Sequence, residues 1–199
     1  MSSRIALIGR SDLAEAFERD HSNHDYQKFF RPEFDITVKH DCDQIVERAQ
    51  ADVYLISAGA YHGDAWTLWM TNCVGPSYLA QRIYETKQHA HVIVISSLGA
   101  RWTSWLGIPS HRLTYNAAKH AVSAFAEALY QSGSSQNRVT VIDPGRFQSS
   151  LNDHTGMPIE RVVQVIDQTI HSDSDVNVVN VQIAYHRDRN NQPGEQHDK

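Results

Sequence analysis

Cysteine is scarce in this sequence of 199 residues, which contains only Cys42 and Cys73. Two cysteines cannot form a framework of disulfides, and so small a number is typical of a reducing compartment. Long apolar runs are absent as well. No stretch reaches the roughly 18 residues that a membrane-spanning helix needs, and the apolar run at residues 5–9 is too short for the core of a signal peptide. We therefore expect a cytoplasmic protein with no membrane partner.

The sequence also lacks an excess of positive charge and any motif with the spacing of metal ligands. The net charge is −5, so the chain lacks the basic footprint of a nucleic-acid-binding protein. Its 12 histidines are scattered and show no H-E-x-x-H or similar spacing, so the sequence predicts no metal site. Hydrophobic residues make up 41% of the chain and charged residues 21%, which is ordinary for one globular domain.

Apolar β-branched runs alternate with helical patterns along the whole chain. We expect strands at residues 5–8, 26–30, 34–38, 52–57, 92–96, 139–142 and 176–183. The spacing of apolar residues predicts helices at 13–19, 42–50, 69–87, 115–131 and 159–170. Because the strands are apolar on both faces, the pattern predicts an α/β fold, a doubly wound Rossmann-type parallel sheet in three layers, α/β/α. This domain spans residues 1–185, and the polar residues 186–199 are expected to form a flexible tail.

The stretch Tyr115-Asn116-Ala117-Ala118-Lys119 carries the clearest chemical signal. Residues four apart share a helix face, so the phenol of Tyr115 and the ammonium of Lys119 are expected to lie side by side. A nearby cation favours the phenolate and lowers the tyrosine pKa, which suits proton exchange with a carbonyl or an alcohol. On its own the Y-x-x-x-K spacing is a weak signal, because it recurs by chance in many helices.

Polar residues at two other places add context. Ser96 and Ser97 follow a predicted central strand, where a hydroxyl can hydrogen-bond a substrate oxygen or simply cap a turn. Asn72 lies in the predicted helix 69–87, where it could organise a water chain to the lysine or serve as a helix-start residue.

These residues and their surroundings resemble the short-chain dehydrogenase/reductase family over nearly the whole chain. The asparagine, serine, tyrosine and lysine occur in the family's order, at Asn72, Ser97, Tyr115 and Lys119. The flanking segments TNCVG, VISS, YNAAKHAVSAFAEAL and VIDPG match as well. The family's P-G-x-x-x-T segment is echoed by residues 144–149, with Ser149 in place of the threonine that hydrogen-bonds the nicotinamide carboxamide.

The resemblance implies a role for each matched residue. Tyr115 would be the general acid and base, and Lys119 would lower its pKa and hold the nicotinamide ribose. Ser97, preferred here over Ser96, would orient the substrate oxygen, and Asn72 would support a proton relay. Family members commonly pair through the two long helices, here 69–87 and 115–131, so the resemblance implies a homodimer or homotetramer.

Two segments depart from the family pattern. The glycine-rich turn keeps Gly9, but Asp12 stands where a second glycine is usual and Ala14 replaces the third. The segment that corresponds to N-N-A-G is Ile56-Ser57-Ala58-Gly59, which retains only the Ala-Gly. By the resemblance and by position after strands, the expected cofactor-binding residues besides Tyr115 and Lys119 are Gly9, Arg10, Ser11, Leu13, Arg31, Asp35, Ile36, Ser57, Ala58, Gly59, Pro144, Gly145 and Ser149.

Charge at the end of the second strand bears on the choice of cofactor. NAD sites usually place a carboxylate there, whereas this chain has Arg31, with Arg10 nearby in the first turn. Two guanidinium groups suit a 2′-phosphate, so NADP is favoured, and NAD stays possible because Glu33 is close. The leading hypothesis is an NADP-dependent reductase of a small carbonyl compound. The alternative is a catalytically inactive relative that senses nucleotide or binds a partner.

Overall fold

The computed structural model describes residues 2–101, 110–133, 136–150, 154–173 and 175–184. Their centre is a six-stranded sheet in which every neighbouring pair of strands is parallel, in the order β2-β1-β3-β4-β5-β6. The predicted tail 186–199 lies outside the described residues. The strands are β1 (Arg4–Ile8), β2 (Asp25–Phe29), β3 (Val53–Ile56), β4 (His91–Ile95), β5 (Arg138–Pro144) and β6 (Asn180–Ile183).

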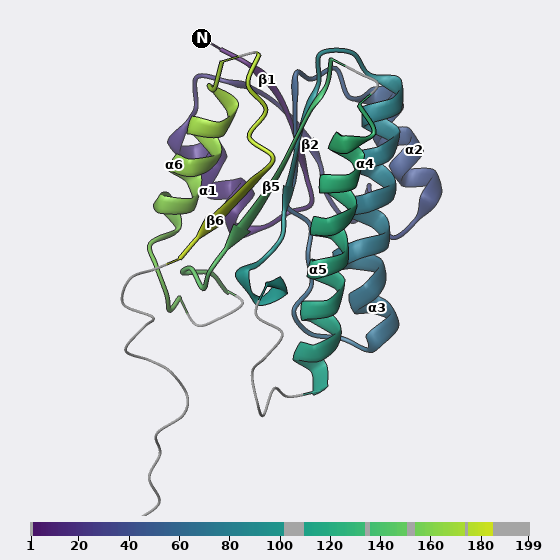
Figure 1. The fold of residues 1–199 in the computed structure, drawn as a ribbon, viewed down its shortest axis with the longest axis vertical. Coiled ribbons are helices and arrows are strands. Elements are labelled where there is room, and N and C mark those ends of the chain that lie inside the picture. Colours follow the sequence, from purple (N-terminus) through teal and green to yellow (C-terminus); the bar gives the residue numbers. More distant parts are fainter. Residues whose placement is uncertain (1, 102–109, 134–135, 151–153, 174, 185–199) are drawn as a thin grey trace, which may run out of the picture.

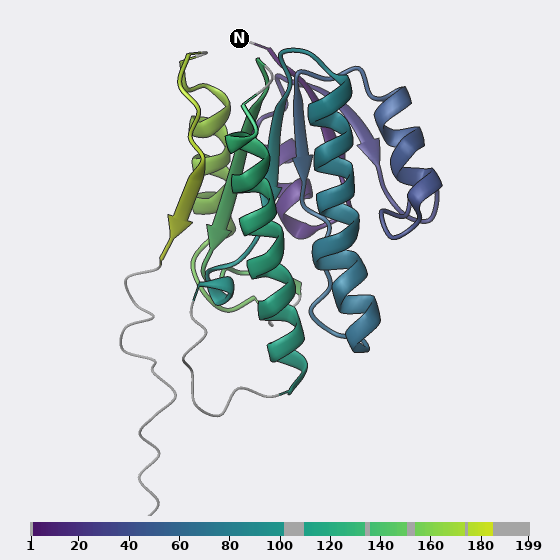
Figure 2. The same cartoon turned by 45° about the vertical axis from the view of Figure 1, so that its right-hand side comes forward.

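Helices cover both faces of this sheet (Figure 1). One face carries α1 (Asp12–Asp20) and α6 (Ile159–Ile170). The other carries α2 (Lys39–Arg48), α4 (Gly75–Thr86) and α5 (Ser110–Gln131), and Figure 2 shows α4 and α5 side by side. The α/β fold in three layers is therefore confirmed.

Alternate residues of the strands pack into two separate hydrophobic cores, one on each face of the sheet. Leu7 on β1 packs with Phe17 of α1 and Ile166 of α6, and all three are fully buried. Its neighbour Ile8 faces the other way, toward Ile45 of α2. Successive strand side chains point to opposite faces, so a strand in the middle layer must be apolar throughout. Each such burial stabilises the fold by about 1.5–3 kcal/mol.

The predicted helix 69–87 is interrupted. It consists of α3 (Ala65–Trp69), one turn of π-helix, η1 (Met70–Val74), and then α4. Gly75 begins α4 directly beside the carbonyl of Ile36, where a Cβ atom would clash. The extra residue of a π-turn displaces its side chains relative to a regular helix, and here it places Asn72, which is completely buried.

Two predicted elements differ in the structure. Residues 34–38 form turns rather than a strand, because the Asp35 carboxylate accepts hydrogen bonds from Arg31 and from both the backbone and the hydroxyl of Thr37. The last strand covers only residues 180–183 of the predicted 176–183. Before it, Asn177 side-chain hydrogen bonds with the backbone of Val139 replace the regular ladder.

Among the described residues, no helix combines the length and apolar character required to cross a membrane.

Candidate active site

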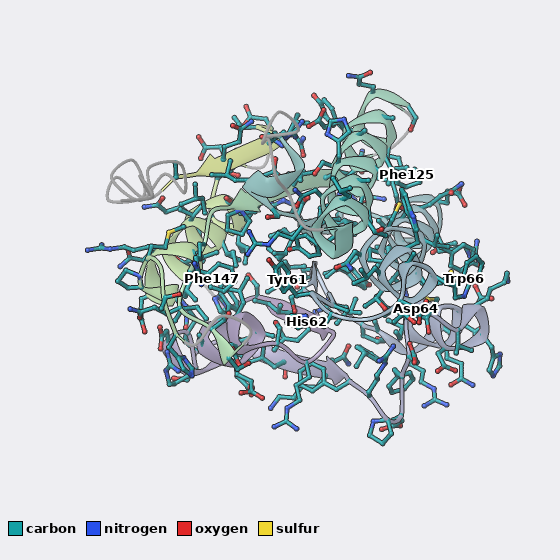
Figure 3. All side chains as sticks on the ribbon, turned by 90° about the horizontal axis from the view of Figure 1, so that it is seen from below. Tyr61, His62, Asp64, Trp66, Phe125 and Phe147 are labelled. Carbon is teal, nitrogen blue, oxygen red and sulfur yellow. The ribbon has the colours of Figure 1, made fainter. Side chains whose placement is uncertain are left out.

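The carboxyl ends of the parallel strands form the lower edge of the molecule in Figure 1, and Figure 3 looks onto this edge. Tyr61, from the loop after β3, lies near the centre of that view, between Phe147 on one side and Trp66 of α3 on the other. The ring of Tyr61 meets the ring of Tyr115 edge to face, with centroids 5.1 Å apart and an interplanar angle of 73°. The expected catalytic tyrosine therefore lies at the edge where Rossmann-type sheets bind ligands.

The hydroxyl of Ser97 lies beside the Tyr115 phenol and acts to lower its pKa. Ser97 follows β4 and caps the short helix η2 (Leu98–Ala100), where its Oγ accepts from the N–H of Gly99 at 3.1 Å. The structure thus brings together two of the predicted residues from separate elements, the end of a central strand and the first turns of α5.

Ser96 has a different environment. Its buried hydroxyl donates to the carbonyl of Lys119 at 2.9 Å and lies 2.7 Å from the hydroxyl oxygen of Ser123. Both partners belong to α5, so Ser96 ties the strand end to the helix. Of the two neighbouring serines, Ser97 is the one that contacts Tyr115.

Lys119 is buried one turn after Tyr115, on the side of α5 that faces the sheet. Its Nζ donates to the carbonyl of Ile95, the last residue of β4, at 2.9 Å. A Cβ atom on Gly59 would lie 3.4 Å from this Nζ and 3.2 Å from Oδ1 of Asn72, so both polar groups border the glycine. Burial lowers the pKa of Lys119 to about 8, while the charge of Asp143 opposes that shift.

The expectation of a lowered tyrosine pKa is wrong for this structure. Burial raises the pKa of Tyr115 to about 12, and the Ser97 hydroxyl opposes the rise without reversing it. The physical reason is that desolvation of the phenol outweighs the effect of Ser97, while the Lys119 ammonium is held against the Ile95 carbonyl. Tyr115 is therefore protonated at neutral pH.

Asn72 holds the loop after β3. Its Nδ2 donates to the carbonyls of Ala60 at 2.7 Å and Leu68 at 3.0 Å, and its Oδ1 accepts from the N–H of Ala60 at 3.1 Å. The side chain therefore positions the loop between Gly59 and Tyr61. Its part in a proton relay stays a prediction.

The turn after β1 is tightly joined to the end of β3. Gly9 has φ +86, and a Cβ atom there would clash with Ala58. Ser57 donates from its hydroxyl to the Gly9 carbonyl at 3.0 Å and accepts from the hydroxyl of Ser11 at 2.9 Å. Ser11 also caps α1 by accepting from the N–H of Ala14 at 3.1 Å. This arrangement brings Gly9, Ser11, Ser57 and Ala58 together, as the sequence predicts.

Leu13 and Ile36 do not face this crevice. Both side chains are buried in the hydrophobic cores, Leu13 against α6 and Ile36 against α2. Their apolar side chains gain more by packing than by exposure at a ligand site. Any contact of Leu13 or Ile36 with a cofactor would therefore involve the backbone, and their part in cofactor binding stays a prediction.

Charged groups surround the first turn of α1. Arg10 is exposed and pairs with Glu15 at 2.8 Å. Asp12 accepts a hydrogen bond from the backbone N–H of Ser150, which joins the N-terminus of α1 to the loop after β5. A helix N-terminus favours anions, so the Asp12 carboxylate occupies a position that would otherwise suit a phosphate.

A cavity of about 260 Å³ lies beside the end of β2. It is lined by Arg31, Thr37, Trp66, Thr67 and Met70. Arg31 pairs with Asp35 at 2.8 Å. Burial alone raises the pKa of Asp35, but the hydrogen bonds from Arg31 and Thr37 hold it below its usual value, so the carboxylate is charged at neutral pH. The Arg31 guanidinium and the Asp35 carboxylate therefore both lie at the end of β2, where the family resemblance leads us to expect the adenosine ribose of the cofactor.

The loop after β5 lies beside α1. Gly145 donates from its N–H to the carbonyl of Ile183 at 2.8 Å, directly after the buried Pro144. Ser149 is buried and lines a second cavity of about 260 Å³ between this loop and α1. The structure places it on the α1 side of the crevice, apart from the contact between Tyr115 and Ser97.

Sequence reasoning missed two contributors. Tyr61 follows Ala58-Gly59-Ala60 and carries no periodic signal, so its contact with Tyr115 emerges only from the fold. Asp143, completely buried at the end of β5, pairs with Arg101 at 2.8 Å and accepts from the hydroxyl of Ser123 at 3.1 Å. An aspartate in an otherwise apolar strand was the available signal for this buried ion pair.

Comparisons with known proteins agree with this geometry. No protein-family model and no curated protein matches the sequence. Solved structures do match. Serine dehydrogenase from Escherichia coli is 17% identical, with 90% of this chain and 96% of that chain covered and a TM-score of 0.71. A 3-alpha-hydroxysteroid dehydrogenase from Pseudomonas sp. B-0831, complexed with NADH, is 16% identical, with 90% and 95% covered and a TM-score of 0.72.

A short chain dehydrogenase from Burkholderia cenocepacia J2315, in complex with NADP, is 14% identical, with 96% and 91% covered and a TM-score of 0.73. At such identities the shared property is the fold. The protein belongs to the class of Rossmann-type α/β proteins. More narrowly, its fold is that of the short-chain dehydrogenases/reductases, which confirms at the level of fold the resemblance seen in the sequence.

Proposed function

We propose that this protein is an NADP(H)-dependent oxidoreductase that transfers a hydride between nicotinamide and a small carbonyl or alcohol substrate. One observation carries the proposal: the Ser97 hydroxyl lies beside the Tyr115 phenol, directly after the carboxyl end of the central strand β4. Two unpaired cysteines support a reducing, cytoplasmic location for the reaction.

The residues present fit a dinucleotide in two places. Gly59 has no side chain, and the buried Nζ of Lys119 lies only 3.4 Å from the position that a Cβ atom would take there, so this ammonium is the group that would hold a ribose hydroxyl. At the other end, Arg31 and the cavity beside Trp66 suit an adenosine that carries a 2′-phosphate. When bound, the dinucleotide supplies or accepts the hydride.

The chain's own residues supply the proton. With a pKa of about 12, the Tyr115 phenol is protonated at neutral pH and can donate to a carbonyl oxygen as that oxygen gains charge. The Ser97 hydroxyl can hydrogen-bond the same oxygen and orient it. Lys119, with a pKa of about 8, is mostly charged at pH 7 and favours the phenolate that the reaction leaves behind.

Nucleotide binding is the first test. NADPH and NADH are titrated separately while the fluorescence of the four native tryptophans is followed. We expect binding below the millimolar range, tighter for NADPH, and a loss of about tenfold or more in Lys119→Ala because a charged ribose contact disappears. Binding of neither nucleotide would contradict the proposal.

Turnover is the second test, followed as loss of NADPH absorbance with a panel of small aldehydes and ketones. Tyr115→Phe keeps the ring and its contact with Tyr61 but removes the proton, so we expect kcat to fall at least a hundredfold while NADPH affinity stays unchanged. Equal losses of kcat and affinity would instead indicate a structural role for the phenol.

A second candidate function follows from Asp12. Its carboxylate, joined to the N–H of Ser150, places negative charge at the N-terminus of α1. That charge opposes a pyrophosphate and favours an inactive relative that senses nucleotide weakly. Asp12→Asn separates the two candidates, because an oxidoreductase gains both affinity and turnover, whereas an inactive sensor gains affinity alone.

A further inference from the structure

Three histidines and an aspartate meet at the amino ends of the strands, at the far end of the sheet from Tyr115. His21 is the C-terminal cap of α1, and His24 lies just before β2. Asp167 belongs to the last turn of α6, and His171 is its C-terminal cap. These four residues, the histidine cluster, come from segments far apart in the sequence but from helices packed on the same face of the sheet.

The candidate ligand atoms converge on one carboxylate. Nε2 of His21 lies 3.4 Å and Nδ1 of His171 lies 3.2 Å from Oδ1 of Asp167. Ligand atoms of His24, Asp167 and His171 all lie within 4.8 Å of one another. In tetrahedral coordination with bonds of about 2.0–2.1 Å, ligand atoms are separated by roughly 3.4 Å. Two of the separations already match that spacing.

His24 supplies an independent observation. Its side chain is only 7% exposed, and its Nδ1 accepts a hydrogen bond from the N–H of Ser3 at 3.0 Å. Its Nε2 is buried, yet no residue in the described part of the chain gives this nitrogen a hydrogen-bond partner. Buried polar atoms in folded proteins nearly always have one. The missing partner is therefore one that this part of the chain does not provide.

The surroundings suit a cation. Helices α1 and α6 both end at the histidine cluster, and helix C-termini carry partial negative charge. Asp167 adds a full negative charge. Imidazole and carboxylate together are ligands that zinc accepts readily. We propose that His24, Asp167 and His171 bind one divalent cation of the zinc type, which joins the segment after α1 to the C-terminal end of α6, with His21 beside the Asp167 carboxylate.

Metal binding at His24 would break one hydrogen bond of the folded chain, and this change can be measured. Metals bind the neutral form of an imidazole ring, through a nitrogen that carries no proton. Because Nδ1 accepts from Ser3, the proton of the neutral ring resides on Nε2. A metal bound at Nε2 moves this proton to Nδ1, so the hydrogen bond from the Ser3 N–H must break.

The first experiment is a calorimetric titration of zinc chloride into untagged protein that has been dialysed against a chelator. We expect one ion per chain. Asp167→Asn and His171→Gln change partly exposed ligands and should fold, and each is expected to weaken binding tenfold or more. His120→Gln removes an exposed histidine of α5 outside the cluster and serves as the matched control, with unchanged binding.

The second experiment records amide and histidine resonances with and without zinc. The Ser3 amide and the His24 ring should shift in the wild type and stay in place in Asp167→Asn. Zinc should also raise the unfolding temperature of the wild type alone, because a ligand that binds only the folded state stabilises it. Equal zinc affinity in Asp167→Asn and the wild type, or no binding by the wild type, overturns the proposal. Neither readout depends on oxidoreductase activity.

Discussion

Lys119 is the residue of the candidate active site whose charge changes closest to neutral pH. Burial lowers its pKa from 10.5 to about 8, so it loses its charge as the pH rises through about 8. In the unfolded chain the same group stays protonated until about pH 10.5, so between these values the unfolded state binds more protons and the free energy of unfolding increases with pH.

The loss of charge on Lys119 should have the opposite effect on nucleotide affinity, which should fall as the pH rises. If the Lys119 ammonium holds the cofactor, the NADPH dissociation constant is expected to rise by about tenfold per pH unit above about 8. Fluorescence titrations from pH 6.5 to 9.5 measure it. Lys119→Met should bind more weakly and show no such slope, and an identical slope in this variant would exclude Lys119 as its source.

At the scale of elements, the turn between β1 and α1 depends on Gly9 for two separate reasons. The residue has a positive φ, and a Cβ atom would collide with Ala58. Gly9→Ala is therefore expected to lower the free energy of unfolding by about 2 kcal/mol or more. Gly133 also has a positive φ, but a Cβ atom there would meet only the carbonyl oxygen of Gln131 at an ordinary contact distance of 3.5 Å, so Gly133→Ala should cost about 1 kcal/mol. Urea unfolding compares the two, and equal losses would contradict the packing argument.

A buried ion pair joins η2 to β5 and α5. Arg101 pairs with the completely buried Asp143 at 2.8 Å and with Glu127 at 2.6 Å. Arg101→Met leaves the Asp143 carboxylate buried without its counter-charge, so we expect a loss of about 3 kcal/mol at pH 7 in urea unfolding. The pair between Arg4 and Asp52 is half-exposed, and Arg4→Met should cost less than about 1 kcal/mol. If the two variants lost similar amounts of unfolding free energy, the argument that burial of Asp143 makes its ion pair important would be contradicted.

At the scale of the whole molecule, several large apolar side chains remain exposed on α3, η1 and α5. These three elements contact one another, and Figure 2 shows α5 beside the helical segment that precedes α4. The exposed fraction is 73% for Trp66, 55% for Leu113 and 46% for Val74. Exposed apolar surface on neighbouring helices supports the proposal that two chains pair through them.

Light scattering after size exclusion tests this pairing. We expect twice the mass of one chain or a higher multiple for the wild type, and the mass of one chain for Leu113→Glu, because a charge in an apolar interface is costly. Val176 is also exposed but lies before β6, so Val176→Glu should leave the assembly unchanged. A wild type that is already monomeric would contradict the proposal.

The order of elements was predictable because parallel strands buried on both faces require unbroken apolar runs, and these are visible in the sequence. The local pattern of apolar residues wrongly predicted a strand at residues 34–38. This segment forms turns because the Asp35 carboxylate accepts hydrogen bonds from Arg31 and Thr37, and apolar spacing does not show such bonds. Tyr115, Lys119, Ser97 and Asn72 were identifiable from their spacing and order. The tertiary structure alone decided which serine meets the tyrosine and how burial sets the pKa of the phenol.

The sequence by itself determined the layers, the strand ends and the helix face shared by Tyr115 and Lys119, because these depend on periodicity within one segment. Only the tertiary structure brought Tyr61 to Tyr115, Arg101 to Asp143, and His24 to Asp167. Contacts between distant segments depend on how helices pack across the sheet, and no local pattern of residues carries that information.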